Sequence, residues 1–243
     1  VIFIIAGILF FLTRVPAVQD ALFQRLAQNL ISTAPNIFPE EDSLSALVCG
    51  SKSPLPHPTR AETCVMIKAG EETFIFDVGN KSIDNLRNWR VPLNQLNSIF
   101  ISHLHSDHIA ELPEIHMWNW IGTGRQSKLK VYGPEGINQV LNGFTEAFSL
   151  DWKYRNDHHG DKFAPLKAAG FDGYEITDFS DPVYESNGIV ITAFLVDHKP
   201  IDPSLAFKIE YKGRSIVLSG DTIYSEAILN NSMNVDVLFH EAF

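Results

Sequence analysis

Four side chains of the kinds that bind metal ions crowd into six positions of this sequence. His103, His105, Asp107 and His108 follow an apolar run over residues 98–102 that predicts a buried strand. Imidazole nitrogens and carboxylate oxygens bind zinc, iron or manganese. On an extended backbone His103 and His105 point to the same side, and Asp107 and His108 follow as the chain turns away. We expect two metal-binding points about 3.5–4 Å apart, as in two-metal hydrolases. A polar strand end with solvated histidines is the alternative, and the density of ligand-type residues argues against it.

Other predicted strands also end in ligand-type residues, namely Asp77, His198, Asp221 and His240. The carboxyl ends of strands in α/β proteins converge at one edge of a sheet, so we expect these side chains to approach the histidine cluster. His198 is placed for a third ligand, and Asp221 can bridge two ions with its two oxygens. Asp77 could orient a ligand histidine, and an ordinary strand-end turn explains it equally well.

The elements that must position these residues follow from periodicity and turn signals. Alternating or continuous apolar runs predict strands at residues 46–49, 64–69, 73–78, 98–102, 128–132, 174–180, 183–185, 189–196, 205–211, 215–219 and 235–239. Helical spacing predicts helices at residues 82–89, 109–120, 136–148 and 224–229. Hairpin turns are predicted at Gly70-Glu71, Asn187-Gly188 and Lys212-Gly213.

Residues 151–162 predict a loop rich in aromatic and basic side chains. Such a loop over the metal-binding strand could bind an anionic or aromatic substrate. The alternative is a surface loop packed by its own aromatic rings. Adjacent histidines point in different directions, so at most one of the two here could bind a metal ion. The candidate substrate-binding residues are Trp152, Tyr154, Arg155, His158 and His159.

The composition is that of an ordinary globular protein. The chain has 243 residues, of which 45% are hydrophobic and 20% charged, and a formal net charge of −10. An acidic balance argues against a broad phosphate-binding surface, since proteins that bind nucleic acid usually carry a basic face. Cys49 and Cys64 lie in neighbouring predicted strands. We favour buried free thiols there, and a disulfide remains the alternative.

The N-terminal segment is apolar from Val1 to Leu12. It is shorter than the roughly 20 residues that cross a bilayer. We interpret residues 1–17 as a signal anchor or signal-peptide remnant, with a buried helix as the alternative. Residues 18–42 predict an amphipathic helix and a linker, and residues 43–243 a hydrolase domain. We therefore expect the protein to be anchored in a membrane or exported. If the first segment is a buried helix instead, we expect it in the cytoplasm.

From about Ala46 to Phe243 the chain resembles the metallo-β-lactamase superfamily. The His-x-His-x-Asp-His motif at residues 103–108 carries the resemblance, together with Phe76-Asp77-Val78-Gly79, His198, Gly220-Asp221-Thr222 and His240-Glu241-Ala242. The resemblance implies an α/β fold of the αββα type, in which two mixed sheets pack face to face with helices outside.

The resemblance also implies a ligand set. His103, His105 and His198 would hold one zinc ion, Asp107 and His108 a second, and Asp221 would bridge them. Manganese or iron(II) are alternatives to the two zinc ions. Members of the family carry a further histidine downstream of the last motif present here. We therefore expect the protein to continue beyond Phe243, and the second metal site to be incomplete in this chain.

Within the superfamily, Val131-Tyr132-Gly133-Pro134-Glu135-Gly136 resembles the ribonuclease Z branch, which also contains zinc-dependent arylsulfatase-like enzymes. Ribonuclease Z usually has a long tRNA-gripping arm between the third histidine and the bridging aspartate, and only 23 positions separate His198 from Asp221. We therefore predict a sulfate or phosphate ester hydrolase of the arylsulfatase type acting on a small anionic ester. A tRNA 3′-processing endonuclease or phosphodiesterase is the alternative; a lactonase or a non-catalytic metal-binding protein is a weaker one. A homodimer is left open.

The chemistry that follows is attack of a metal-bound hydroxide on sulfur or phosphorus. Asp107 would orient or deprotonate the water, and His240 would protonate the leaving group, with Glu241 tuning it. An aromatic leaving group could stack on Trp152 or Tyr154, and Arg155 could hold the anionic group.

Overall fold

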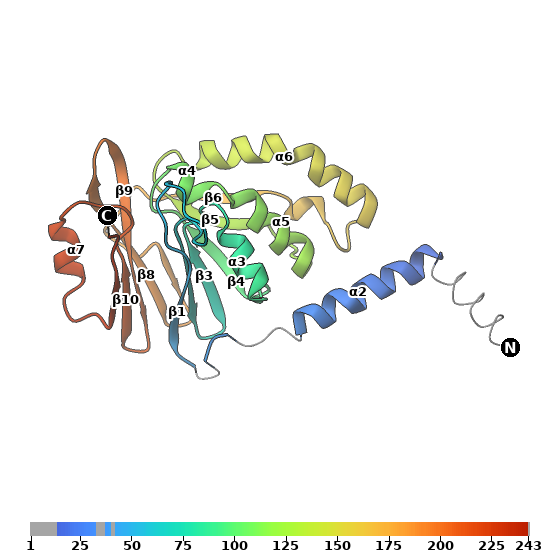
Figure 1. Cartoon of the computed structure of the whole chain (residues 1–243), viewed down its shortest axis with the longest axis horizontal. Helices are drawn as coiled ribbons and strands as arrows, with labels where there is room; N and C mark the ends of the chain where they lie inside the picture. The colour runs from blue at the N-terminus through green and yellow to red at the C-terminus, as the bar shows by residue number, and fades with distance from the viewer. Residues whose placement is uncertain (1–13, 33–36, 40–41, 243) are drawn as a thin grey trace.

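Two β-sheets face each other, with helices on their outer sides (Figure 1). This computed structural model describes residues 14–32, 37–39 and 42–242. The arrangement confirms the predicted αββα sandwich. The first sheet has six strands, in the order β1 (Leu44–Gly50), β2 (Cys64–Ala69), β3 (Glu72–Phe76), β4 (Leu96–Phe100), β5 (Leu129–Gly133) and β6 (Phe171–Glu175). The second sheet has five, in the order β11 (Val237–Phe239), β10 (Arg214–Leu218), β9 (Ile201–Tyr211), β8 (Ile189–His198) and β7 (Tyr184–Ser186).

Both sheets are mixed. In the first sheet β1, β2 and β3 pair antiparallel, and β3 to β6 run parallel. In the second sheet, as far as the described residues go, β10 and β11 pair parallel and the other neighbouring strands pair antiparallel. Parallel strands end at the same edge of a sheet, so the residues after β3, β4 and β5 emerge together. Leu205 of β9 donates its N–H to the oxygen of Ser102 at 2.9 Å, which ties the second sheet to this edge.

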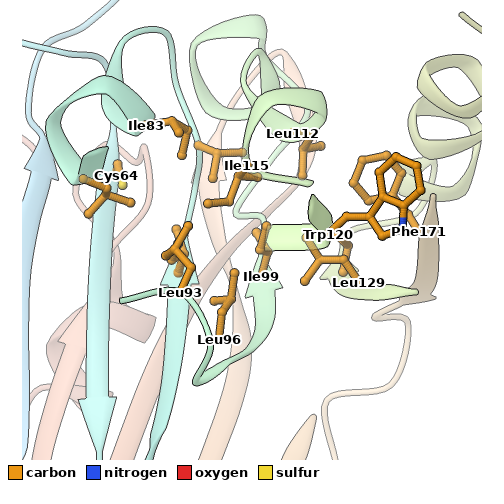
Figure 2. Close-up of a cluster of buried hydrophobic side chains, with 14 of the residues drawn as sticks. Cys64, Ile83, Leu93, Leu96, Ile99, Leu112, Ile115, Trp120, Leu129 and Phe171 are labelled. Carbon is orange, nitrogen blue, oxygen red and sulfur yellow. The ribbon is translucent and has the colours of Figure 1, made fainter. Parts of the chain in front are cut away.

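Side chains that alternate along each strand build two separate cores. On β3, Phe74 and Phe76 face the second sheet, and Ile75 faces the helices on the opposite side. The helices over that outer face are α3 (Ser82–Asn88), α5 (Leu112–Thr123) and α6 (Ile137–His159). Figure 2 shows the apolar cluster between them and the sheet, including Leu112, Trp120 and Phe171. The short α7 (Glu226–Asn231) covers the outer face of the second sheet, where Ile228 packs on Ala206 and Val217.

A ladder of aromatic rings lines the face of the first sheet that meets the second. Phe76, Phe100, Tyr132 and Tyr174 belong to four neighbouring strands, and their rings stack with centroid separations of 5.0, 4.8 and 4.8 Å. Phe207 of β9 meets Phe76 and Phe100 edge-on. Stacked and edge-on rings add to the burial of apolar area, so the ladder fixes the strands in register and holds the sheets together.

Two predicted elements are wrong. Residues 151–159 of the predicted loop are helical instead, because α6 continues to His159, and only residues 160–162 lie outside it. An amphipathic pattern places Leu141 and Trp152 on the buried side of that long helix. The strand predicted at residues 174–180 is β6, which ends earlier, at Glu175. The strand begins earlier than predicted, with Phe171-Asp172-Gly173. Aspartate and glycine are uncommon in strands, so the sequence gives no strand signal at these positions.

The prediction of free thiols is also wrong. Cys49 and Cys64 form a disulfide between the end of β1 and the start of β2. Their Cα atoms are 5.0 Å apart, as neighbouring antiparallel strands allow. The register of the pair shifts between Val48 and Gly50, so Cys49 lies at a bulge beside Cys64. The bridge closes the loop of residues 50–63 at its base.

The predicted N-terminal helix is present as α2 (Pro16–Ser32). Two of its apolar side chains, Leu22 and Leu26, are exposed. Most of the predicted anchor, residues 1–13, lies outside the described residues. Across the part of the chain that the structure describes, no helix is long and apolar enough to cross a bilayer.

Burial of His116 in α5 leads us to expect that the folded protein becomes less stable in acid. Its ring is buried against Trp120 and Trp152, and its Nε2 accepts the N–H of Gly170 at 2.8 Å. Burial lowers the pKa of His116 to about 4, so the folded protein keeps the ring neutral while the unfolded chain takes up a proton near pH 6.5. We expect the free energy of unfolding to fall by up to about 3 kcal/mol between pH 6.5 and 4.

Urea unfolding at a series of pH values checks this expectation. His116→Gln keeps an acceptor for the N–H of Gly170 but does not titrate. The variant should be less stable at pH 7.5 and should lose less stability than the wild type as the pH falls to 4.5. Equal losses in the two proteins would show that His116 does not govern the acid response.

Candidate metal centre

Six ligand-type residues from three strand ends meet at one edge of the sandwich. His103 and His105 follow β4, and Asp107 and His108 lie in the short helix α4 (Ser106–Ile109). His198 is the last residue of β8, and Asp221 follows β10. The structure thus brings together segments that lie 118 positions apart in the sequence.

Two groups of these residues have their ligand atoms within 4.8 Å of one another. One contains His103, His105 and His198, and the other contains His103, His108 and Asp221. His103 belongs to both groups, so the two candidate sites are adjacent. Asp107 lies outside both groups, with Oδ2 3.7 Å from Nε2 of His108. The structure does not bring His240 into either group, because its ring is exposed after β11.

The donor atoms fit a divalent cation. Nε2 of His108 and Nε2 of His198 are buried and have no hydrogen-bond partner. Buried polar atoms are almost always paired, so two unpaired nitrogens at one site indicate a missing partner. Oδ1 of Asp221 lies 3.5 Å from Nε2 of His108, and Oδ2 lies 4.0 Å from Nε2 of His198. Three imidazoles and a carboxylate are ligands that zinc accepts.

Charge in the centre is balanced between the His108 ring and the carboxylates beside it. Burial, and then the positive charge of His108, lower the pKa of His103 to about 3, so its ring is neutral. Burial also opposes the charge on His108, but the carboxylates of Asp77 and Asp221 outweigh it and raise its pKa to about 10. Burial raises the pKa of Asp221, and the His108 ring more than offsets this and lowers it. Asp221 therefore carries a negative charge between two unpaired nitrogens.

Asp77 orients the ligands from behind. Its Oδ2 accepts from Nδ1 of His108 and from the hydroxyl of Ser102, both at 2.8 Å, and its Oδ1 accepts the N–H of Ser102 at 2.8 Å. Nδ1 of His108 therefore keeps a hydrogen, and Nε2 is the nitrogen that would bind a metal ion once it has lost its own proton. The backbone of Asp77 has φ of 59°, a conformation that Asp tolerates better than most residues. Only a strand-end aspartate is visible in the sequence, and Ser102 was not predicted.

Close backbone packing holds the ligand turn in place. Val78 donates its N–H to the oxygen of His108 at 2.8 Å, and Glu111 donates its N–H to the oxygen of Val78 at 2.9 Å. Gly79 lies so close that an added Cβ would stand 2.0 Å from the oxygen of Asp107. Glu62 and Lys52 form a nearly buried ion pair beside Gly79, and Glu62 also accepts the N–H of Asn80. The glycine is therefore a packing requirement of the centre.

Glu241 positions the other side of the centre. Its carboxylate accepts the N–H of Thr222, and its own N–H donates to Oγ of Ser219 at 3.1 Å. These two bonds fix the turn that carries Asp221. The sequence predicts that the Glu241 side chain tunes His240. In the structure, Nδ1 of His240 instead contacts the backbone oxygen of Glu241, at 2.8 Å.

The predicted substrate-binding residues are not brought to the centre. All five lie in the C-terminal part of α6, and the N-terminus of that helix, at Gly136, is the part that approaches Leu104. A helix rises about 1.5 Å per residue, which puts Tyr154 roughly 25 Å along α6 from that end. Trp152 is buried against His116, and Arg155 pairs with Asp151 on the helix surface. A substrate role for Trp152, Tyr154, Arg155, His158 and His159 has no geometric support here.

Comparisons with known proteins agree with this geometry. The family model described as "Anti-Pycsar protein Apyc1" matches residues 48–243. "Ribonuclease Z" of Mycobacterium bovis (strain BCG / Pasteur 1173P2) is 31% identical over 199 residues, covering 81% of this chain and 69% of that protein. "Ribonuclease Z" of Mycobacterium marinum is 32% identical over 193 residues, covering 79% and 67%.

Solved structures share the fold. Human tRNase Z, short form, superposes with a TM-score of 0.61 at 21% identity, covering 79% of this chain and 76% of that one. A metallo-β-lactamase fold protein of Bacillus subtilis gives a TM-score of 0.59 at 19% identity, covering 82% and 70%.

Proposed function

The chain belongs to the Anti-Pycsar protein Apyc1 family and to the ribonuclease Z-like hydrolases of the metallo-β-lactamase superfamily, and on that premise we propose that it is a metal-dependent phosphodiesterase. The observation that supports this most is the pair of ligand groups that share His103. Relatives named ribonuclease Z favour the phosphodiester alternative over the sulfate-ester reading that the sequence favoured.

We further propose that His103, His105 and His198 would hold one zinc ion and that His108 and Asp221, with Asp107 nearby, would hold a second. A divalent ion at such a site supplies Lewis acidity, which neutralises charge on phosphoryl oxygens and makes water acidic enough to react at neutral pH. The buried carboxylate of Asp107 is placed to take the proton of the attacking water as the new O–P bond forms.

The leaving oxygen needs a proton when its bond to phosphorus breaks. His240 is the candidate donor: Nδ1 of its exposed ring donates to the Glu241 backbone oxygen, and the imidazolium form carries a second hydrogen on Nε2 that it can give to the leaving oxygen. Glu241 contributes indirectly, by holding the N–H of Thr222 and so the turn at Asp221. Water therefore loses one proton to Asp107, and the leaving group gains one from His240.

A short hairpin bears on the size of the substrate. The chain turns from His198 at the end of β8 to Ile201 at the start of β9 through Lys199 and Pro200 alone. No arm of the kind that grips tRNA in ribonuclease Z is present between His198 and Asp221. With a net charge of −10, this favours hydrolysis at a short nucleotide or an RNA end over the binding of a whole folded tRNA.

Turnover of three substrates by the zinc-loaded protein tests the proposal. We expect hydrolysis of bis(p-nitrophenyl) phosphate, its loss on treatment with a chelator, and its recovery when zinc or manganese is restored. An aryl sulfate should not be hydrolysed above background. Cleavage of the sulfate without the phosphodiester would overturn the proposal, and efficient cleavage of precursor tRNA would overturn the restriction to short substrates.

A further inference from the structure

An apolar stripe on α2 is left exposed by the rest of the described chain. Val15, Leu22 and Leu26 are 44%, 46% and 62% exposed. Their spacing of seven and four positions places them on one side of a helix. Val15 precedes the first helical residue, and its oxygen accepts the N–H groups of Val18 and Gln19 at 2.9 and 3.0 Å, so the chain is already in helical register there. The stripe therefore begins at the N-terminus of α2.

The other side of α2 is polar and approaches the folded domain. Asp20 lies about 140° around the helix from Val15. Partial burial and neighbouring positive charges lower the pKa of His159, at the end of α6, and the carboxylate of Asp20 acts against that shift. Charges act on one another over short distances in salt solution, so Asp20 lies near the end of α6. Figure 1 shows α2 projecting from the two sheets, and the apolar stripe lies on the far side of the helix from this contact.

The sequence around the stripe is typical of a chain that meets lipid. Val1–Leu12, which lies outside the described residues, contains no charged or polar side chain. Residues 1–32 hold two arginines and one aspartate, in a chain whose net charge is −10. Arg25 is exposed at the flank of the stripe, about 80° around the helix from Val15. An apolar stripe with basic side chains at its edge is the pattern of helices that lie on a membrane surface.

α2 is suited to lie on a bilayer and not to cross it. Asp20 and Arg25 stand in the middle of its 17 residues, and a crossing helix would bury both charges in hydrocarbon. A helix that lies flat puts the stripe into the boundary between headgroups and acyl chains and leaves Asp20 in water. The polar side of α2 then faces the domain.

The disulfide is an independent observation that agrees with a place beside a membrane. Cys49 and Cys64 are fully buried and bonded to each other. Disulfides form and persist in oxidising compartments, which a protein reaches by crossing a membrane. A chain that works there has a membrane surface at hand.

We propose that the apolar stripe of α2, formed by Val15, Leu22 and Leu26, binds the surface of a lipid bilayer, with Arg25 at the level of anionic headgroups. Burial of the three side chains supplies most of the free energy of binding, and the arginine adds attraction to anionic lipid. This surface is separate from the metal centre and does not depend on the proposed hydrolysis.

Quenching of tryptophan fluorescence by brominated lipid tests the proposal in the full chain. Leu26→Trp is mixed with vesicles of phosphatidylcholine and phosphatidylglycerol in equal parts. Bromine near the headgroup end of the acyl chains should quench about half or more of the emission that Leu26→Trp adds to that of the wild type. Bromine near the chain ends should quench less, because an interfacial helix enters only about 5–10 Å.

A matched control places the same ring away from α2. Met233 is 65% exposed and lies two positions after α7, which is across the molecule from α2 in Figure 1. Met233→Trp should show no quenching. Full emission of Leu26→Trp in brominated vesicles, or equal quenching of the two tryptophans, would overturn the proposal.

Charge substitutions test the stripe by co-sedimentation with the same vesicles. Leu22→Glu combined with Leu26→Glu should weaken binding about tenfold or more. Leu229→Glu combined with Met233→Glu adds the same two charges, four positions apart, at similarly exposed side chains, and should bind as the wild type does. Arg25→Gln should weaken binding to these vesicles about fivefold and leave binding to pure phosphatidylcholine unchanged.

Light scattering and turnover distinguish the other outcomes. A wild-type dimer that becomes a monomer in Leu22→Glu with Leu26→Glu, while Leu26→Trp is not quenched, would show that the stripe binds a second copy, and the proposal would fail. All of these variants should hydrolyse bis(p-nitrophenyl) phosphate at the wild-type rate. Membrane binding in a protein that hydrolyses no phosphodiester would overturn the proposed function alone.

Discussion

Asp221→Asn is expected to lower kcat/KM for phosphodiester hydrolysis by about 10³-fold or more while the fold is kept. Asp221 is the one carboxylate in the two ligand groups found among the described residues. Its oxygens approach the unpaired nitrogens of both His108 and His198, so its carboxylate reaches residues of both groups, which also share His103. The amide is nearly isosteric but carries no charge, so it neither balances a cation nor bridges two ions.

The measurement pairs steady-state kinetics with the metal content of the dialysed protein. Zinc content should fall below that of the wild type, and circular dichroism should show unchanged secondary structure. Asp181→Asn, at an exposed acid on a surface turn, removes the same charge away from the centre and should leave both quantities unchanged. Wild-type rates in Asp221→Asn would show that this aspartate is not part of the centre.

Asp77→Asn is expected to weaken zinc binding about 10–100-fold and to lower the free energy of unfolding of the metal-free protein by about 2–3 kcal/mol. Asparagine also tolerates a positive φ, and its oxygen can still accept the N–H of Ser102, so the backbone turn survives. Its amide nitrogen cannot accept from Nδ1 of His108, and that buried ring loses the carboxylate that orients it.

Competition with a chelating dye gives the zinc affinity, and urea denaturation gives the stability. Ser102→Ala removes one of the donors to Asp77 and leaves the His108 bond intact, so both of its effects should be smaller. Zinc affinity in Asp77→Asn equal to that of the wild type would mean that the ring of His108 is oriented by something other than Asp77.

The convergence of ligand-type residues could be predicted because it depends on strand ends. Apolar runs mark β4, β8 and β10, and a histidine or aspartate closes each one or follows it closely. Because the two sheets pack face to face, the ends of these strands lie together at one edge of the sandwich. The same reasoning could not supply Ser102 or the pairing of Glu241 with Thr222, because these contacts depend on turn geometry that no spacing encodes.

The misjudged elements share a physical cause. Polar and charged residues after Phe148 suggested a loop, yet Trp152 is buried against the outer core and holds that stretch in α6. Tertiary burial outweighed local composition there. The bulge at Cys49 similarly set the pairing of the two cysteines, and a sequence alone does not reveal a bulge.

The disulfide gives this chain one closed covalent ring, formed by residues 49–64. The exposed stretch around Leu55 and Arg60 lies inside that ring. A single cut there opens the ring without releasing either part of the protein, and β1 stays fastened to β2. The hydrogen bonds between Glu62 in this loop and Asn80, next to Gly79, then remain on the same molecule. The loop of residues 50–63 can therefore be cut or vary in length while β1 and β2 stay covalently linked.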